Sequence, residues 1–190
     1  MKAIELQPLG DNEPDVLVSL RRALQETFGV PAKVRDAPME IVPFYDEKRG
    51  QYNSTAILHR IAGGAASHPA NGNLKRDDGV CIMGITAYDL FIPILTYVFG
   101  EAALDGSVAV VSYHRFRNEL YGLPVDRPLM IERLCKVAIH EIGHTLGLVH
   151  CTLQYCVMHS ASYVEELDLK SPQFCPFCRN LLGHRLLPRQ

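Results

Sequence analysis

The sequence lacks three features, and each absence removes a class of protein. No stretch approaches the roughly 18 consecutive apolar residues of a membrane-spanning helix. The opening residues, MKAIELQPLGD, include Glu5 and Gln7 and so lack the unbroken apolar segment of a signal peptide. The chain has 19 Lys and Arg against 21 Asp and Glu and no long basic run, which disfavours nucleic-acid binding. We therefore expect a cytoplasmic protein with no membrane and no nucleic-acid partner.

The chain has the size and the apolar content of one domain. It has 190 residues, and 47% of them are hydrophobic, which is enough for a continuous core. No internal repeat or low-complexity segment is visible. Nothing indicates an oligomeric state, so we expect a monomer.

Hydrophobic periodicity predicts strands that alternate with helices. The expected elements are strands at 2–9, 33–35, 40–44, 80–88 and 107–113 and helices at 15–28, 53–66, 129–146 and 177–182. The longest helix has Pro128 just before it and Gly147 at its end, the usual start and stop residues. This order favours an α/β (α+β) fold, with a sheet lobe at 1–147 and a small Cys-rich lobe at 148–190.

The most informative stretch is HEIGHTLGLVH at residues 140–150. On a helix, His140 and His144 are four positions apart and project from one face, so they can bind one ion together. Gly147 can adopt a positive φ, which would end the helix and let His150 approach from outside it. Three imidazoles leave the fourth position of a zinc ion open to water, as in a catalytic site.

The residue after the first histidine completes a hydrolytic site. Glu141 is displaced around the helix, where it can reach a metal-bound water. Zinc lowers the pKa of such a water to about 7 and polarises the scissile carbonyl. Glu141 would take the water's proton as general base and pass it to the leaving amine. We therefore expect a zinc metallopeptidase that acts on peptides or partly unfolded proteins.

A second metal site is expected near the C-terminus. Four of the six cysteines lie within the last forty residues: Cys151, Cys156, Cys175 and Cys178. The CxxC at 175–178 alone would suit redox chemistry, which stays open as an alternative, but four clustered cysteines favour metal. Four thiolates complete a tetrahedron and exclude water, so this second zinc would be structural. It would hold together a lobe that is poor in apolar residues.

The other candidate ligands have weaker patterns. Cys81 and Cys135 lie in apolar runs and are expected to be buried, inert thiols. Five histidines show no ligand spacing among themselves and are expected on the surface or in the core. They are His59, His68, His114, His159 and His184. Of these, His159 is the one placed for a substrate contact.

Taken together, these residues resemble the archaemetzincins, a family of metzincin-type zinc metallopeptidases. The resemblance rests on HEIGHTLGLVHC (140–151), Cys156-Val157-Met158 and Cys175-Pro176-Phe177-Cys178. It implies a twisted mixed sheet with a backing helix and an active-site helix, above a small lobe that ends in a helix. It also implies that Met158 forms an apolar base beneath the catalytic zinc.

The resemblance implies one further feature, and the sequence differs from other metzincins at two points. It implies an antiparallel edge strand beside the cleft, which pairs with an extended peptide. We assign Ser107–Tyr113 to this edge as a hypothesis, with an internal strand as the alternative. Ser160 stands two residues after the methionine, where some metzincins have a tyrosine. Secreted metzincins often have an inhibitory propeptide, whereas we expect this chain to start directly at its first strand.

Two other functions stay open at this point. One is a non-proteolytic zinc-binding protein that keeps the metzincin fold, and the intact Glu141 argues against it. The other is an interaction module built on the Cys-rich lobe. Such a module would show clustered Lys and Arg, whereas only Lys170 occurs between residues 151 and 178.

Overall fold

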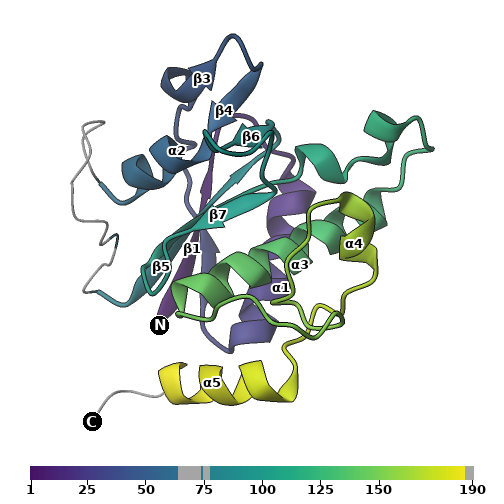
Figure 1. Cartoon of the computed structure of the whole chain (residues 1–190). Coiled ribbons are helices and arrows are strands. Elements are labelled where there is room, and N and C mark those ends of the chain that lie inside the picture. Colours follow the sequence, from purple (N-terminus) through teal and green to yellow (C-terminus); the bar gives the residue numbers. More distant parts are fainter. Residues whose placement is uncertain (64–73, 75–77, 187–190) are drawn as a thin grey trace.

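The computed structural model describes residues 1–63, 74 and 78–186 and is built around a five-stranded mixed sheet (Figure 1). In spatial order its strands are β2 (Ala32–Val34), β1 (Ala3–Pro8), β5 (Val80–Thr86), β8 (Val108–Ser112) and β7 (Gly100–Ala102). The first four run parallel, and β7 pairs with β8 in the antiparallel direction. The expected mixed α/β fold is confirmed.

Helices cover both faces of the sheet because strand side chains alternate between the faces. The three main helices are α1 (Pro14–Phe28), α2 (Ser54–Ile61) and α3 (Arg127–Thr145). On β5, Met83 and Ile85 belong to the apolar cluster that includes the buried residues of α1 and α3. Ile82, next to Met83, belongs to the cluster that includes α2. The helix that carries the two metal-motif histidines therefore packs directly on the sheet.

Shorter elements surround this core. A small second sheet joins β3 (Tyr45–Asp46), β4 (Gln51–Asn53) and β6 (Leu90–Phe91), and the chain after α3 carries α4 (Val164–Asp168) and α5 (Pro176–Leu186) (Figure 1). The described residues also include the 3₁₀ helices η1 (Val42–Phe44), η2 (His114–Phe116) and η3 (Asn118–Tyr121). Within the described residues, no helix combines the length and the apolar character needed to cross a membrane.

Both ends of α3 are defined by specific hydrogen bonds. At its start, the side chain of Asp126 accepts from the backbone N–H of Leu129 at 3.0 Å, an N-cap. At its end, the carbonyl of His144 accepts from the backbone N–H of Asp105, at 3.0 Å, in the turn between β7 and β8. The last turn of α3 is thus fixed against the sheet.

Several predicted elements are confirmed within a few residues, the strand at 107–113 among them, but one predicted strand and one predicted placement are wrong. Residues 40–44, predicted as a strand, contain η1, because Pro43 fixes φ and has no N–H to donate to a sheet. Ser107–Tyr113, proposed as the edge strand, contains the internal strand β8, which lies between β5 and β7 and is buried throughout. The antiparallel edge strand is β7.

The second helix is also shorter than predicted. The pattern at 53–66 predicted continuation to Ala66, but α2 ends at Ile61 and Gly63 has a φ of 85°. Residues 64–66 lie outside the described residues. The predicted helix at 177–182 is confirmed as part of α5.

A buried arginine ties α3 to the segment that follows the metal motif. Arg133 is 5% exposed and donates to both carboxylate oxygens of Asp168 in α4, at 2.8 and 2.6 Å. It also donates to the carbonyl of Phe116 and the side chain of Asn118, both at 2.9 Å. All of these acceptors would lose their partner together if the guanidinium were removed.

We expect Arg133→Met to lower the free energy of unfolding by roughly 2–4 kcal/mol, because removing one partner of a buried network leaves the others unsatisfied. Arg127→Met is the matched control, since Arg127 pairs with Glu13 and Asp15 near the surface and should cost much less. Urea unfolding of the zinc-loaded proteins measures both. An equal loss of unfolding free energy in the two variants would contradict the conclusion that Arg133 is the centre of a buried hydrogen-bond network.

Candidate metal centres

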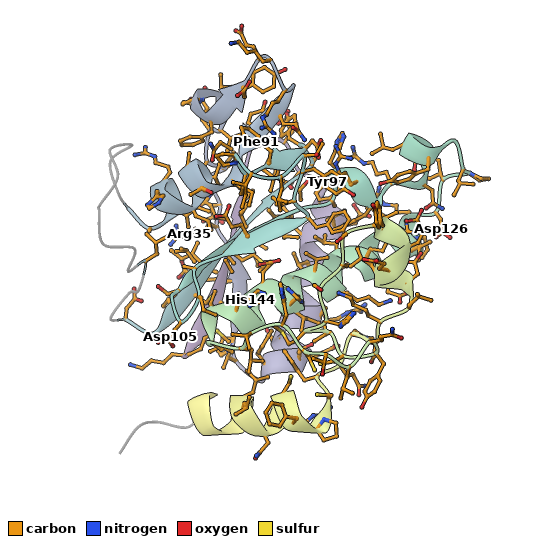
Figure 2. All side chains as sticks on the ribbon, viewed as in Figure 1. Arg35, Phe91, Tyr97, Asp105, Asp126 and His144 are labelled. Carbon is orange, nitrogen blue, oxygen red and sulfur yellow. The ribbon has the colours of Figure 1, made fainter. Side chains whose placement is uncertain are left out.

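Three histidine rings converge at the end of α3. His140 and His144 come from consecutive turns of α3, and Figure 2 labels His144 there; His150 comes from the chain just beyond the helix. The ring centroids are 4.5 Å apart for His140 and His144, and 5.2 and 5.0 Å from these two to His150. One ring nitrogen from each lies within 4.8 Å of the others, so the three could hold one metal ion.

Hydrogen bonds determine which nitrogen faces the centre. Nδ1 of His140 lies 2.8 Å from the carbonyl of Val157, and Nδ1 of His144 lies 2.7 Å from the carbonyl of Leu148. A carbonyl only accepts, so each Nδ1 carries a proton. In a neutral imidazole the other nitrogen is then a bare acceptor. Metal-binding histidines are typically oriented by such a hydrogen bond.

The two bare nitrogens face each other. Nε2 of His140 lies 2.9 Å from Nε2 of His144. Burial lowers the pKa of His140 to about 3 and also lowers the pKa of His144, so both rings are neutral at neutral pH. Two lone pairs at this distance repel unless a cation lies between them. The donor set therefore fits a zinc ion.

The chain turns back after α3 as the sequence predicts. Gly147 has a φ of 79°, and its N–H donates to the carbonyl of His144 at 2.8 Å. The N–H of Leu148 donates to the carbonyl of Gly143 at 3.0 Å. These bonds close the helix end and bring His150 back toward the other two rings.

A methionine lies against the same helix turn. Met158 is fully buried, and a Cβ atom at Gly143 would overlap its sulfur. Its carbonyl accepts from the N–H of Cys151 at 2.9 Å, while the preceding residue, Val157, orients His140. Glycine at position 143 is thus required by the close approach of this methionine.

The carboxyl group beside the histidines is buried. Glu141 is 7% exposed, and burial, followed by the nearby charge of Glu101, raises its pKa to about 8. Glu101, on β7, accepts from Ser54 at 2.5 Å and from Thr55 at 2.9 Å. A Cβ atom at Gly100 would lie 2.8 Å from Cγ of Glu141. Strand β7 therefore passes directly against Glu141.

The four clustered cysteines form a second candidate centre. Their sulfur atoms lie within 4.8 Å of one another, and those of Cys151 and Cys175 are 3.9 Å apart. Zinc–sulfur bonds of about 2.3 Å in a tetrahedron place sulfurs about 3.8 Å apart, so the donor set fits zinc. Backbone N–H groups of Leu153 and Cys178 point at sulfur at 3.5 Å, which favours thiolates. All four cysteines are free of disulfides.

A cavity of about 480 Å³ adjoins the three-histidine centre. Its walls come from the connection between β6 and β7, from α3, and from the segment 157–170. Tyr97, labelled in Figure 2, donates its hydroxyl proton to the carbonyl of Ser162 at 2.7 Å. This bond joins two walls that are 65 residues apart in sequence.

The remaining cysteines match their prediction in part. Cys81 is buried, as expected, and burial raises its pKa to about 11. Cys135 is only partly buried, because it lies on the side of α3 at the margin of the core, although burial still raises its pKa to about 11.

The remaining histidines lie apart from the metal centres or bond to the backbone. His59 lies on α2, and Nδ1 of His114 lies 3.3 Å from the carbonyl of Ala87. Nδ1 of His159 lies 2.8 Å from the carbonyl of Cys151, and His159 does not line the cavity. His68 and the side chain of His184 lie outside the described residues.

Sequence and structure comparisons give consistent results. The model of peptidase family M54 matches residues 30–184. An archaemetzincin of Methanocaldococcus jannaschii is 36% identical over 180 residues, 95% of this chain and 92% of that protein. A solved zinc-dependent peptidase from Methanocorpusculum labreanum has a TM-score of 0.81, 30% identity, and coverage of 94% of this chain and 99% of that one. For an archaemetzincin from Methanopyrus kandleri, the TM-score is 0.79, the identity 31%, and the coverage 97% and 95%.

We expect Gly143→Ala to lower the free energy of unfolding by roughly 1–3 kcal/mol and to weaken zinc retention at the histidines, because the new methyl group displaces Met158. Gly183→Ala is the control: Gly183 lies in α5, and a methyl group added there would meet no neighbouring atom, so alanine should be neutral or slightly stabilising. Thermal unfolding and zinc analysis test both variants. If Gly143→Ala is as stable as Gly183→Ala, the methionine contact is not a constraint.

Proposed function

The chain belongs to the archaemetzincins, the zinc-dependent peptidase family M54, and on that premise we propose that it hydrolyses peptide bonds at the three-histidine centre. The ligands of the catalytic zinc would be His140, His144 and His150. One observation supports this most strongly: the bare Nε2 atoms of His140 and His144 lie 2.9 Å apart with no proton between them. A cation bound between them would relieve the repulsion of the two lone pairs.

Glu141 is the proposed general base. When bound, zinc supplies Lewis-acid chemistry by activating water and polarising a carbonyl. The Glu141 carboxylate takes a proton from the attacking water and delivers it to the leaving amine nitrogen. Its position favours this role, because Glu141 lines the cavity beside His140 and His150.

The edge strand β7 is the proposed binding site for the peptide backbone. It forms one edge of the main sheet, and Gly100 on it touches Glu141. An extended peptide that pairs with this edge would therefore run past the catalytic carboxyl group. We propose peptides or partly unfolded proteins as substrates, since only an extended backbone can add to a sheet in this way.

A second, structural zinc is proposed at the four cysteines. Cys151 follows His150 directly, and its N–H bonds to Met158. Metal at this cluster would hold both the third histidine and the methionine in place. We further propose one domain in two lobes, 1–147 and 148–190. They share an apolar cluster in which Val157 and Leu167 of the second lobe join residues of α3.

We expect Glu141→Gln to retain two zinc ions and to lower kcat by a factor of roughly 10²–10⁴, the usual contribution of a general base. Glu26→Gln, on the exposed side of α1, is the control and should keep full activity. Hydrolysis of a mixed peptide library, together with zinc analysis, measures both effects. Full activity in Glu141→Gln would exclude the proposed role. A wild type that holds both zinc ions yet cleaves no peptide would favour the non-proteolytic alternative.

A further inference from the structure

Two buried lysines line the cavity beside the metal centre. Lys136, on α3, is 3% exposed, and Lys170, beyond α4, is 6% exposed. His140 and Glu141 line the same cavity. Lysines are almost never buried to this extent unless their charge is matched. A buried lysine whose charge is not matched by groups of the protein is therefore available to bind a negatively charged ligand in the cavity.

The charge of Lys136 is matched within the protein. Its ammonium group forms an ion pair with Glu132 at 2.7 Å and donates to the carbonyl of Leu167 at 2.9 Å. This lysine serves to join α3 to α4. It has little capacity left for a ligand.

The charge of Lys170 is not matched in this way. Its ammonium group donates one hydrogen bond, to the carbonyl of His159, and forms no ion pair with any carboxylate in the described part of the chain. The negative groups that act on it through space are Glu166, then Cys156, then Glu141. The Glu166 carboxylate already accepts from the backbone N–H groups of Ser162 and Tyr163. An ammonium group has three donors, so two remain for a group that enters the cavity.

We propose that Lys170 is a specificity residue whose ammonium group binds a carboxylate of the peptide substrate inside this cavity. The inference rests on the proposed peptidase function. Burial lowers the pKa of Lys170 to about 8, so the group is still charged at neutral pH. The surrounding walls include the apolar side chains of Val137 and Leu167, which lower the local dielectric constant and so strengthen a charge-assisted hydrogen bond.

The carboxylate could come from either of two parts of a peptide. It is either the side chain of an Asp or Glu near the cleaved bond or the free C-terminus of a short peptide. Both present the same chemistry to Lys170. The substrates in the test must therefore separate them.

The experiment compares matched peptides on the zinc-loaded protein. In one series, a single Glu or its isostere Gln is placed in turn at each of three positions on either side of the cleaved bond, with amidated C-termini. In the other, short peptides carry either a free or an amidated C-terminus. We expect kcat/KM to be about tenfold to a hundredfold higher for the carboxylate member of one series. The series that responds identifies the source.

Substitutions assign the preference to Lys170. Lys170→Met should bring the acid-to-amide ratio of kcat/KM close to one. Lys170→Gln should do the same. Because its amide can still donate to the carbonyl of His159, this variant provides the test even if Lys170→Met fails to fold. Lys136→Met is the matched control, a buried lysine of the same cavity whose removal should leave the ratio unchanged.

The outcomes separate this inference from the proposed function. Wild type that cleaves peptides with no preference in either series overturns the role of Lys170 and leaves the peptidase function intact. A fall in kcat/KM by the same factor for both members of each pair also overturns it, since that result indicates a structural role. Wild type that cleaves nothing while holding two zinc ions refutes the peptidase proposal itself.

Discussion

The repulsion between two unprotonated imidazole nitrogens is the constraint on which the rest of the site depends. With both Nδ1 protons on backbone carbonyls, Nε2 of His140 and Nε2 of His144 lie 2.9 Å apart as two acceptors, an arrangement that suits a cation between them. One of those carbonyls belongs to Val157 and the other to Leu148. The chain beyond α3 must therefore return to the helix twice, and the bonds at Gly147 and Cys151 accomplish this.

Other contacts hold the histidine centre and Glu141 in place from different sides. Four clustered cysteines gather the segment after His150, Arg133 ties α4 to α3, and Met158 fills the space that Gly143 leaves. On the opposite side, β7 passes against Glu141 because Gly100 has no side chain to keep it away. Helix α3 is thus enclosed between the sheet and an irregular segment whose own apolar residues join the main core.

Much of this arrangement could be predicted from the sequence because it is local. The spacing of His140, His144 and Gly147 follows from helix geometry, and a cluster of four cysteines indicates metal whatever the surrounding fold. Residues that act across long sequence distances escaped prediction. Gly100 belongs to a three-residue strand without alternation, so nothing marked it as the edge beside Glu141. Whether the ammonium group of Lys170 has a carboxylate partner likewise depends on groups that only the folded chain brings together.

The proposed function requires that the three histidines and the four cysteines each hold one zinc ion. Crystals of the purified, zinc-loaded protein, measured above and below the zinc absorption edge, would test it by locating the metal directly. We expect two anomalous peaks, one about 2.0–2.1 Å from the three histidine nitrogens and one about 2.3 Å from the four sulfurs. A peak at the cysteines alone, with the histidine rings rotated away from the Val157 and Leu148 carbonyls, would contradict it.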